Sequence, residues 1–155
     1  RKAPARFPFI FIRTFPPTSK SMSLPNKGKI LALDLGTKRT GVAVSDKDQQ
    51  IAFLRDELEH DGDADLLAQL EKLLAGEPIV GILAGVPLYL SGENSPQTEK
   101  VLKQIDLLEK FALPIQKIDE RFSTVEAFAP KMKVVDSRSA QIILENYFRT
   151  IRNDA

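Results

Sequence analysis

The sequence contains no cysteine and a single histidine, and these two scarcities exclude several kinds of site. Without cysteine the chain can form no disulfide framework, no thiolate metal site and no cysteine nucleophile. The histidine, His60, lies in a run of charged residues, and no second histidine or cysteine can complete a ligand pair with it. We therefore expect His60 to be solvated rather than catalytic. The lack of cysteine also fits a reducing compartment.

Long apolar runs are missing as well, since none approaches the roughly 20 residues that a membrane-spanning helix needs. We therefore expect no membrane contact. Acidic residues are absent from residues 1–28, which carry six basic side chains and a charge of +6. Because the whole chain has a net charge of +1, residues 29–155 carry −5. A contact with nucleic acid would have to come from a local basic patch rather than from the overall field.

Residues 1–28 also differ from the rest in having five prolines and no hydrophobic periodicity. Prolines at this density exclude a helix or a central strand. We expect residues 1–28 to be a disordered or non-native leader, with Met22 as a plausible natural start, and residues 29–152 to form the folded domain. An acid-free leader with arginine and serine also fits an organelle transit peptide. Otherwise we expect a cytoplasmic protein.

The remaining chain has the length and the composition of one ordinary globular domain, with 43% hydrophobic and 28% charged residues. Two successive apolar runs predict strands at 30–33 and 42–44, and a third strand is expected to continue at about 50–58. Helices and strands then alternate: a helix at 63–75 capped by Asp63, a strand at 79–84, a helix from the Ser95 cap to about 111, a strand at 114–118, a short helix at 123–130, and a last helix with Ala140, Ile143, Leu144, Tyr147 and Ile151 on one face. A meander followed by strand–helix units predicts an α/β fold. Its five-stranded mixed sheet would have the order 3-2-1-4-5, flanked by helices, which fits the ribonuclease H-like fold.

Asp34 follows the apolar run Ile30–Leu33, where a carboxylate is costly unless it has a partner or a metal ion. It could accept hydrogen bonds from the backbone of the following loop. Lys38 and Arg39 in this glycine-containing loop favour a metal and phosphate site instead. The Asp-x-Gly-Thr sequence is also similar to the hairpin with which sugar kinases, Hsp70 and actin hold ATP phosphates. Those proteins need a duplicated domain, which this chain length does not provide.

Two further carboxylates could join Asp34. In the expected sheet order the first and fifth strands end close together, so Glu120 would lie near Asp34. Asp136 precedes Ala140 of the last helix by four residues and therefore shares its buried face. Glu120 could instead be a surface acid, and Asp136 an N-cap. Acids that cluster without histidine or cysteine form a hard oxygen site suited to Mg²⁺ or Mn²⁺, which can support phosphodiester hydrolysis.

Five sequence blocks, in order and spacing, resemble the signature blocks of the YqgF (RuvX) family: Asp34–Gly41, Gly85–Leu88, Ser95–Gln97, Asp119–Thr124 and Val134–Asp136. The resemblance extends from about residue 29 to 150. It implies a bacterial-type nuclease that hydrolyses phosphodiester bonds in the 5′-end maturation of pre-16S ribosomal RNA, within ribosome biogenesis. The family is distantly related to the RuvC Holliday junction resolvases. The resemblance also implies that Asp34, Glu120 and Asp136 are the catalytic, metal-binding triad.

We therefore predict a nuclease, dependent on Mg²⁺ or Mn²⁺, that acts on precursor ribosomal RNA as a monomer or weak dimer. Its expected substrate-binding residues are Gly36, Thr37, Lys38, Arg39 and Arg121. A DNA nuclease that resolves Holliday junctions needs the same triad, so branched DNA stays open as the substrate. A catalytically weak RNA- or ribosome-binding domain also stays open, because only residues 128–133 stand where the family has a longer basic helical stretch.

Overall fold

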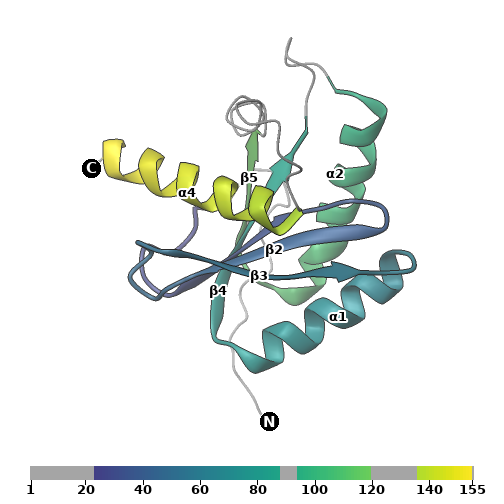
Figure 1. The fold of residues 1–155 in the computed structure, drawn as a ribbon, viewed down its shortest axis with the longest axis horizontal. Coiled ribbons are helices and arrows are strands. Elements are labelled where there is room, and N and C mark those ends of the chain that lie inside the picture. The colour runs from purple at the N-terminus through teal and green to yellow at the C-terminus, as the bar shows by residue number, and fades with distance from the viewer. Residues whose placement is uncertain (1–22, 88–93, 120–135, 155) are drawn as a thin grey trace.

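The computed structural model describes residues 23–87, 94–119 and 136–154, with the backbone alone at 136, 137 and 152–154. The strands are β1 (Lys29–Asp34), β2 (Arg39–Ser45), β3 (Ala52–Glu59), β4 (Ile79–Val86) and β5 (Ile115–Asp119). The helices are α1 (Asp63–Gly76), α2 (Pro96–Leu108), the 3₁₀ turn η3 (Glu109–Phe111) and α4 (Asp136–Asp154) (Figure 1). The short helix expected at 123–130 lies outside the described residues. Of the helices described, none is long and apolar enough to cross a membrane.

The five strands form one sheet in the order β3-β2-β1-β4-β5, so the predicted strand order is confirmed. The strands β1, β2 and β3 form an antiparallel meander, whereas β4 pairs parallel to β1, and β5 pairs parallel to β4. The apolar runs explain this order, because β1 and β4 are buried on both faces and must lie inside the sheet. The parallel strands β1, β4 and β5 therefore end at the same edge.

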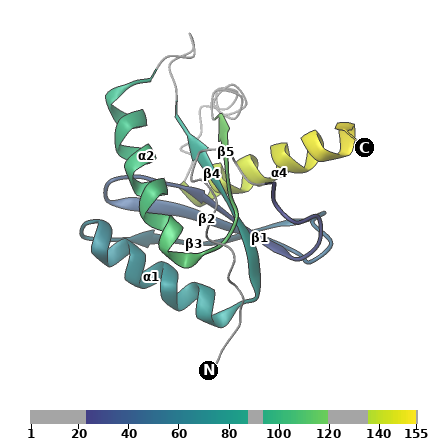
Figure 2. The ribbon, with the colours of Figure 1, turned by 180° about the vertical axis from the view of Figure 1, so that it is seen from behind.

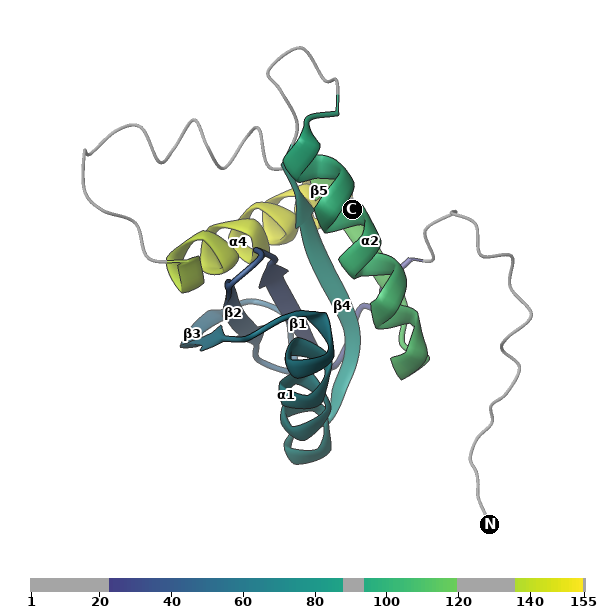
Figure 3. The ribbon, with the colours of Figure 1, turned by 90° about the vertical axis from the view of Figure 1, so that its right-hand side faces the viewer.

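Helices cover both faces of the sheet, with α1 and α2 on one side and α4 on the other (Figures 2 and 3). Side chains of a strand alternate between its faces. Accordingly Leu31 and Leu33 of β1 pack in the core under α1 and α2. Ile30 and Ala32 pack in the second core under α4. The position of a residue along β1 thus determines whether its side chain points toward α1 and α2 or toward α4.

Of the two helix N-caps predicted from the sequence for α1 and α2, the structure confirms one. Ser95 caps α2 as predicted, because its side chain accepts a hydrogen bond from the Thr98 N–H at 3.1 Å. The predicted cap of α1 at Asp63 is wrong, since Gly62 occupies the N-cap with a φ of 97°. Asp65, in the first turn of α1, instead reaches back and accepts a hydrogen bond from the Asp61 N–H at 2.9 Å. The carboxylate still lies where the helix dipole favours negative charge.

We expected the folded domain to begin at residue 29, but packed residues precede it. Leu24 is buried with 7% of its surface exposed, in the core under α4. The Gln49 amide donates hydrogen bonds to the carbonyls of Pro25 and Gly28, at 2.9 and 3.0 Å. Residues 24–28 therefore belong to the packed domain. The proline-rich composition hid this, because a single buried leucine produces no periodic pattern.

Candidate functional site

Asp34 is the last residue of β1, in the middle of the sheet, and its side chain is half-buried. It lies opposite Gly41 of β2. Because Ile30 and Ala32 of the same strand point toward α4, the alternation directs Asp34 toward α4 as well. The structure therefore places this carboxylate at the edge where the parallel strands end, on the side of the sheet that α4 covers.

The other predicted carboxylates are not tested by the structure. Glu120 and Arg121 lie outside the described residues, directly after β5 ends at Asp119. Asp136 begins α4, which packs across β1, β2 and β3, but its side chain is outside the description. Among the described side chains, no group of three histidine, cysteine or acidic residues could hold a metal ion. The metal-binding triad therefore stays a prediction. Of its three residues, the structure describes the position of the Asp34 side chain alone.

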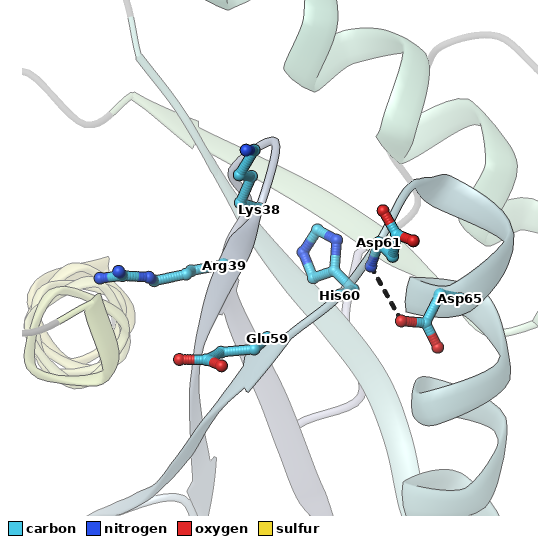
Figure 4. A pocket seen from close by; sticks show the side chains of 6 residues that line it. All are labelled: Lys38, Arg39, Glu59, His60, Asp61 and Asp65. Carbon is cyan, nitrogen blue, oxygen red and sulfur yellow. Dashed lines mark hydrogen bonds between the residues drawn. The ribbon is translucent and has the colours of Figure 1, made fainter.

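The predicted substrate-binding residues 36–39 form the loop between β1 and β2 and the first residue of β2. Arg39 precedes Gly41 by two residues on β2, so it shares the face of Asp34. Figure 4 shows Arg39 directed toward α4 and Lys38 at the tip of the hairpin. Both side chains are exposed, and neither takes part in the three ion pairs found within the described chain, namely Lys27–Asp48, Lys29–Glu77 and Arg55–Glu77. Within the part of the chain that the structure describes, no acidic side chain therefore occupies either cation.

Gly36 has a steric reason to be glycine. A Cβ atom at this position would lie 2.5 Å from the carbonyl oxygen of Arg39. That oxygen belongs to the backbone and cannot move aside without changing the loop. The contact therefore requires the absence of a side chain, and it brings the start of the loop against the residue that carries the guanidinium.

His60 is not solvated as we expected from the sequence. Only 7% of its surface is exposed, and its Nε2 atom lies 2.9 Å from the hydroxyl oxygen of the fully buried Thr40. Leu58 packs in the core under α1, and His60 follows it by two residues, one position past the end of β3, so the extended alternation directs both to the same side. This alternation was the signal that could have placed His60 correctly.

An open pocket of roughly 370 Å³ lies beside His60, lined by Lys38, Arg39, Glu59, His60, Asp61 and Asp65 (Figure 4). Figure 4 shows Arg39 and Glu59 on the α4 side of the strands and the two aspartates on the α1 side. The Asp61 N–H, followed by the Gln69 side chain, holds the pKa of the Asp65 carboxyl below its ordinary value. The α1 side of the pocket is therefore anionic. An anionic ligand is favoured at the hairpin, where Lys38 and Arg39 lie.

A family model described as "RuvX: Holliday junction resolvase" matches residues 28–150 of this chain. The chain belongs to the RuvX family. A relative from Maridesulfovibrio salexigens is 35% identical over 130 residues, which are 77% of this chain and 96% of the relative. A relative from Koribacter versatilis is 39% identical over 131 residues, which are 77% of this chain and 86% of the relative. Both carry the name "Putative pre-16S rRNA nuclease".

Solved structures confirm the ribonuclease H-like fold of this RuvX chain. RuvC of T. thermophilus in complex with a Holliday junction substrate matches it with a TM-score of 0.57, covering 80% of this chain and 95% of that one. A structure of Thermus thermophilus RuvC alone matches with a TM-score of 0.55, covering 81% of this chain and 96% of that one. The sequence identities are 12% and 10%, so these matches show the fold alone.

Proposed function

We propose that this RuvX chain is a divalent-metal-dependent endonuclease that acts on the precursor of 16S ribosomal RNA, in its 5′-end maturation. The relatives' names and the RuvC-like fold support a nuclease. The observation that carries the proposal is the position of Asp34. It ends the central strand on the side covered by α4, and Arg39 shares its face. A carboxylate and an exposed guanidinium at this edge suit a metal ion and a phosphate group.

The donor chemistry fits Mg²⁺ or Mn²⁺. Asp34 supplies carboxylate oxygens, the chain has no cysteine, and its one histidine is engaged with Thr40 on the opposite side of the sheet. A set of oxygen donors without thiolate or imidazole favours hard divalent cations. In this proposal Asp34, Glu120 and Asp136 hold the metal. When bound, the metal would supply charge neutralisation and an activated water for phosphodiester hydrolysis.

The chain's own residues would hold the substrate. Lys38 and Arg39 are exposed at the hairpin and can neutralise phosphates that flank the scissile bond. Arg39 can bind a phosphate in bidentate fashion on the face of Asp34. Gly36 lets the loop fold against Arg39, and the Thr37 hydroxyl beside them is exposed. Arg121 would add a cation from the segment after β5.

The family description favours branched DNA as a second candidate substrate, because it names a Holliday junction resolvase. Both substrates contain phosphodiester bonds. Asp34 and Arg39 are proposed to act at the phosphates and not at the bases, so these two residues do not distinguish RNA from DNA. The test is cleavage of a precursor RNA that spans the 16S 5′ end, beside a four-way DNA junction of equal nucleotide count, each with Mg²⁺, Mn²⁺ or EDTA.

We expect metal-dependent cleavage of the RNA at a rate well above the rate of cleavage of the DNA junction. Preferential cleavage of the junction would assign the chain to DNA instead. Binding of RNA without cleavage in either metal would support an RNA-binding domain and contradict the nuclease.

A further inference from the structure

Gln104 is a polar side chain on the buried face of α2, with 5% of its surface exposed. Its side-chain amide donates one hydrogen bond to the carbonyl oxygen of Gly36 at 3.0 Å. It donates a second to the Asp63 carboxylate at 3.3 Å. One amide therefore joins α2, the first turn of α1 and the loop between β1 and β2. A buried amide is costly unless it is satisfied in this way.

The other end of the loop is held by His60. Its ring Nε2 lies 2.9 Å from the Thr40 hydroxyl oxygen, and its backbone N–H donates to the carbonyl oxygen of Lys38 at 3.0 Å. His60 and Thr40 are both buried. These contacts attach the hairpin, just after its tip, to the segment that leads into α1.

The loop is thus fixed at both ends and exposed between them. Gly36 is held by Gln104, and Lys38 and Thr40 by His60, while the Thr37 side chain is exposed. Since a Cβ on Gly36 would meet the Arg39 carbonyl, the loop has little room to fold in another way. None of the holding contacts uses the ammonium of Lys38 or the guanidinium of Arg39.

We propose that Gln104 and His60 are positioning residues for the substrate-binding loop. Neither contacts the substrate. Gln104 acts through the Gly36 carbonyl and His60 through the Thr40 hydroxyl and the Lys38 carbonyl, so that the Lys38 and Arg39 cations face the phosphates in one arrangement, beside Asp34. This inference rests on the proposed function, because the arrangement of the cations matters only when phosphates bind there.

The test compares two glutamines of the same chemistry. Gln104→Met keeps the length of the side chain and removes the amide that holds the loop. Gln141→Met is the matched control, because the Gln141 amide donates to a backbone carbonyl too, that of Ala52, at 3.1 Å. Ala52 pairs with Ser45, at the opposite end of β2 from Arg39, so the control leaves the loop alone. Both variants are made in the full chain, and folding is checked by thermal unfolding.

Two readouts are measured for each variant. The first is backbone amide relaxation and hydrogen exchange at residues 36–40, which needs no substrate. The second is RNA cleavage at several salt concentrations. We expect Gln104→Met to increase the mobility of residues 36–40. We also expect it to raise the KM for RNA by about five- to tenfold with little change in kcat, because one hydrogen bond that positions the loop is lost. The slope of log affinity against log salt should fall by about one. Gln141→Met should do neither.

Thr40→Val provides the corresponding test of His60, because valine keeps the shape of threonine and lacks the hydroxyl. It should mobilise the loop and raise the KM in the same direction as Gln104→Met.

The possible failures are distinguishable. If Gln104→Met leaves residues 36–40 as rigid as in the wild type, the positioning role is wrong, whatever the enzyme does. A mobile loop with the KM of the Gln141→Met control would also overturn it. If the wild type cleaves no RNA, the proposed function fails, and the positioning of cations for RNA fails with it.

Discussion

Asp34 and Arg39 lie on the same face of the sheet although they belong to different strands. Asp34 pairs with Gly41 of β2, and Arg39 precedes Gly41 by two residues, so both side chains are directed toward α4. Glu59 lies opposite Arg39 in the pairing of β2 with β3, yet among the described residues no ion pair joins them. Among the described residues, the exposed guanidinium of Arg39 therefore shares the face of Asp34 without an ion-pair partner, as the proposed phosphate contact requires.

Replacing this cation should weaken RNA binding through charge rather than through folding. Arg39→Gln is expected to lower the affinity for RNA and to reduce the slope of log affinity against log salt by about one, because one phosphate contact is lost. Lys72→Gln is the control, since Lys72 is an exposed lysine on α1 away from the hairpin. Filter binding of RNA at 50 to 200 mM salt, a range over which phosphate contacts change affinity strongly, measures both slopes. Equal slopes for the two variants would exclude Arg39 from the interface.

A methyl group at Gly36 should disturb the loop. Gly36→Ala brings Cβ to 2.5 Å from the Arg39 carbonyl, so the backbone has to shift, at a cost of about 1–3 kcal/mol in the free energy of unfolding. Gly76→Ala, at the end of α1, meets nothing within 4 Å and should be neutral or stabilise the fold by up to about 1 kcal/mol. Urea denaturation of both variants gives the two values. A Gly36→Ala variant as stable as wild type would mean that the loop accommodates the methyl group without strain.

Glu77 should make stability depend on pH. Its carboxylate accepts hydrogen bonds from Arg55 and from Lys29, and its side chain is only 19% exposed. The Arg55 hydrogen bonds, opposed by burial and assisted by Lys29, hold the pKa of Glu77 below its ordinary value. A lowered pKa means that the folded state favours the ionised carboxylate. Its stabilisation is thus full above about pH 4.5 and is lost as the pH falls through the lower folded value.

Glu77→Gln therefore should cost about 1–2 kcal/mol at pH 7, and the difference from wild type should shrink below pH 4. Glu71→Gln, at an exposed position of α1, the helix that ends just before Glu77, serves as the control and should change little. Thermal unfolding from pH 3 to 7 follows both. A Glu77→Gln deficit that is constant with pH would show that the lost contacts do not depend on the charge.

The segment before residue 29 should divide into two parts. Deletion of residues 1–21 should leave the midpoint of thermal unfolding unchanged, because proline-rich sequence without periodicity has no face to bury. Leu24→Ala should destabilise the fold by about 2 kcal/mol, since Leu24 is buried against the core under α4. A large drop in midpoint on deleting 1–21 would show that the cluster Phe7–Phe15 packs on the domain.

The fold was predictable because its central strands, β1 and β4, are continuous apolar runs. Buried runs such as Ile30–Leu33 can lie only inside a sheet, and the meander at their start leaves few orders of strands. The position of Asp34 was predictable for the same reason. Leu24 was not, because a lone apolar residue among prolines has no periodic partner.

The contacts that hold the loop were harder to foresee. Gln104 lies on the apolar stripe of α2, three residues after Val101 and four before Leu108, which is the one sign in the sequence that it is buried. Its hydrogen bond to Gly36 joins residues 68 apart and depends on how α2 packs against the sheet. His60 was misjudged from its charged neighbours, although its spacing from Leu58 indicated the core side. Charged neighbours in the sequence predict the exposure of a side chain poorly when the alternation of side chains along the strand places it on the core side.

Asp34 is the central residue of the proposed nuclease site, and Asp46 provides a reference for a purely structural aspartate. The Asp46 carboxylate accepts hydrogen bonds from the backbone N–H groups of Gln50 and Ile51, at 2.7 and 2.8 Å. Asp46→Asn should therefore cost about 1 kcal/mol of stability and leave catalysis intact. If Asp34 shares divalent ions with Glu120 and Asp136, the like charges repel one another without metal, so removing one of them should not destabilise the apo protein.

The decisive measurement is therefore made on Asp34→Asn, with metal-free stability and Mn²⁺-dependent RNA cleavage determined on the same preparation. We expect cleavage to be abolished, while the metal-free protein unfolds at the wild-type midpoint or slightly above it. A variant that is clearly destabilised, as Asp46→Asn should be, and that still cuts RNA would contradict the account, because Asp34 would then be a structural residue of the hairpin.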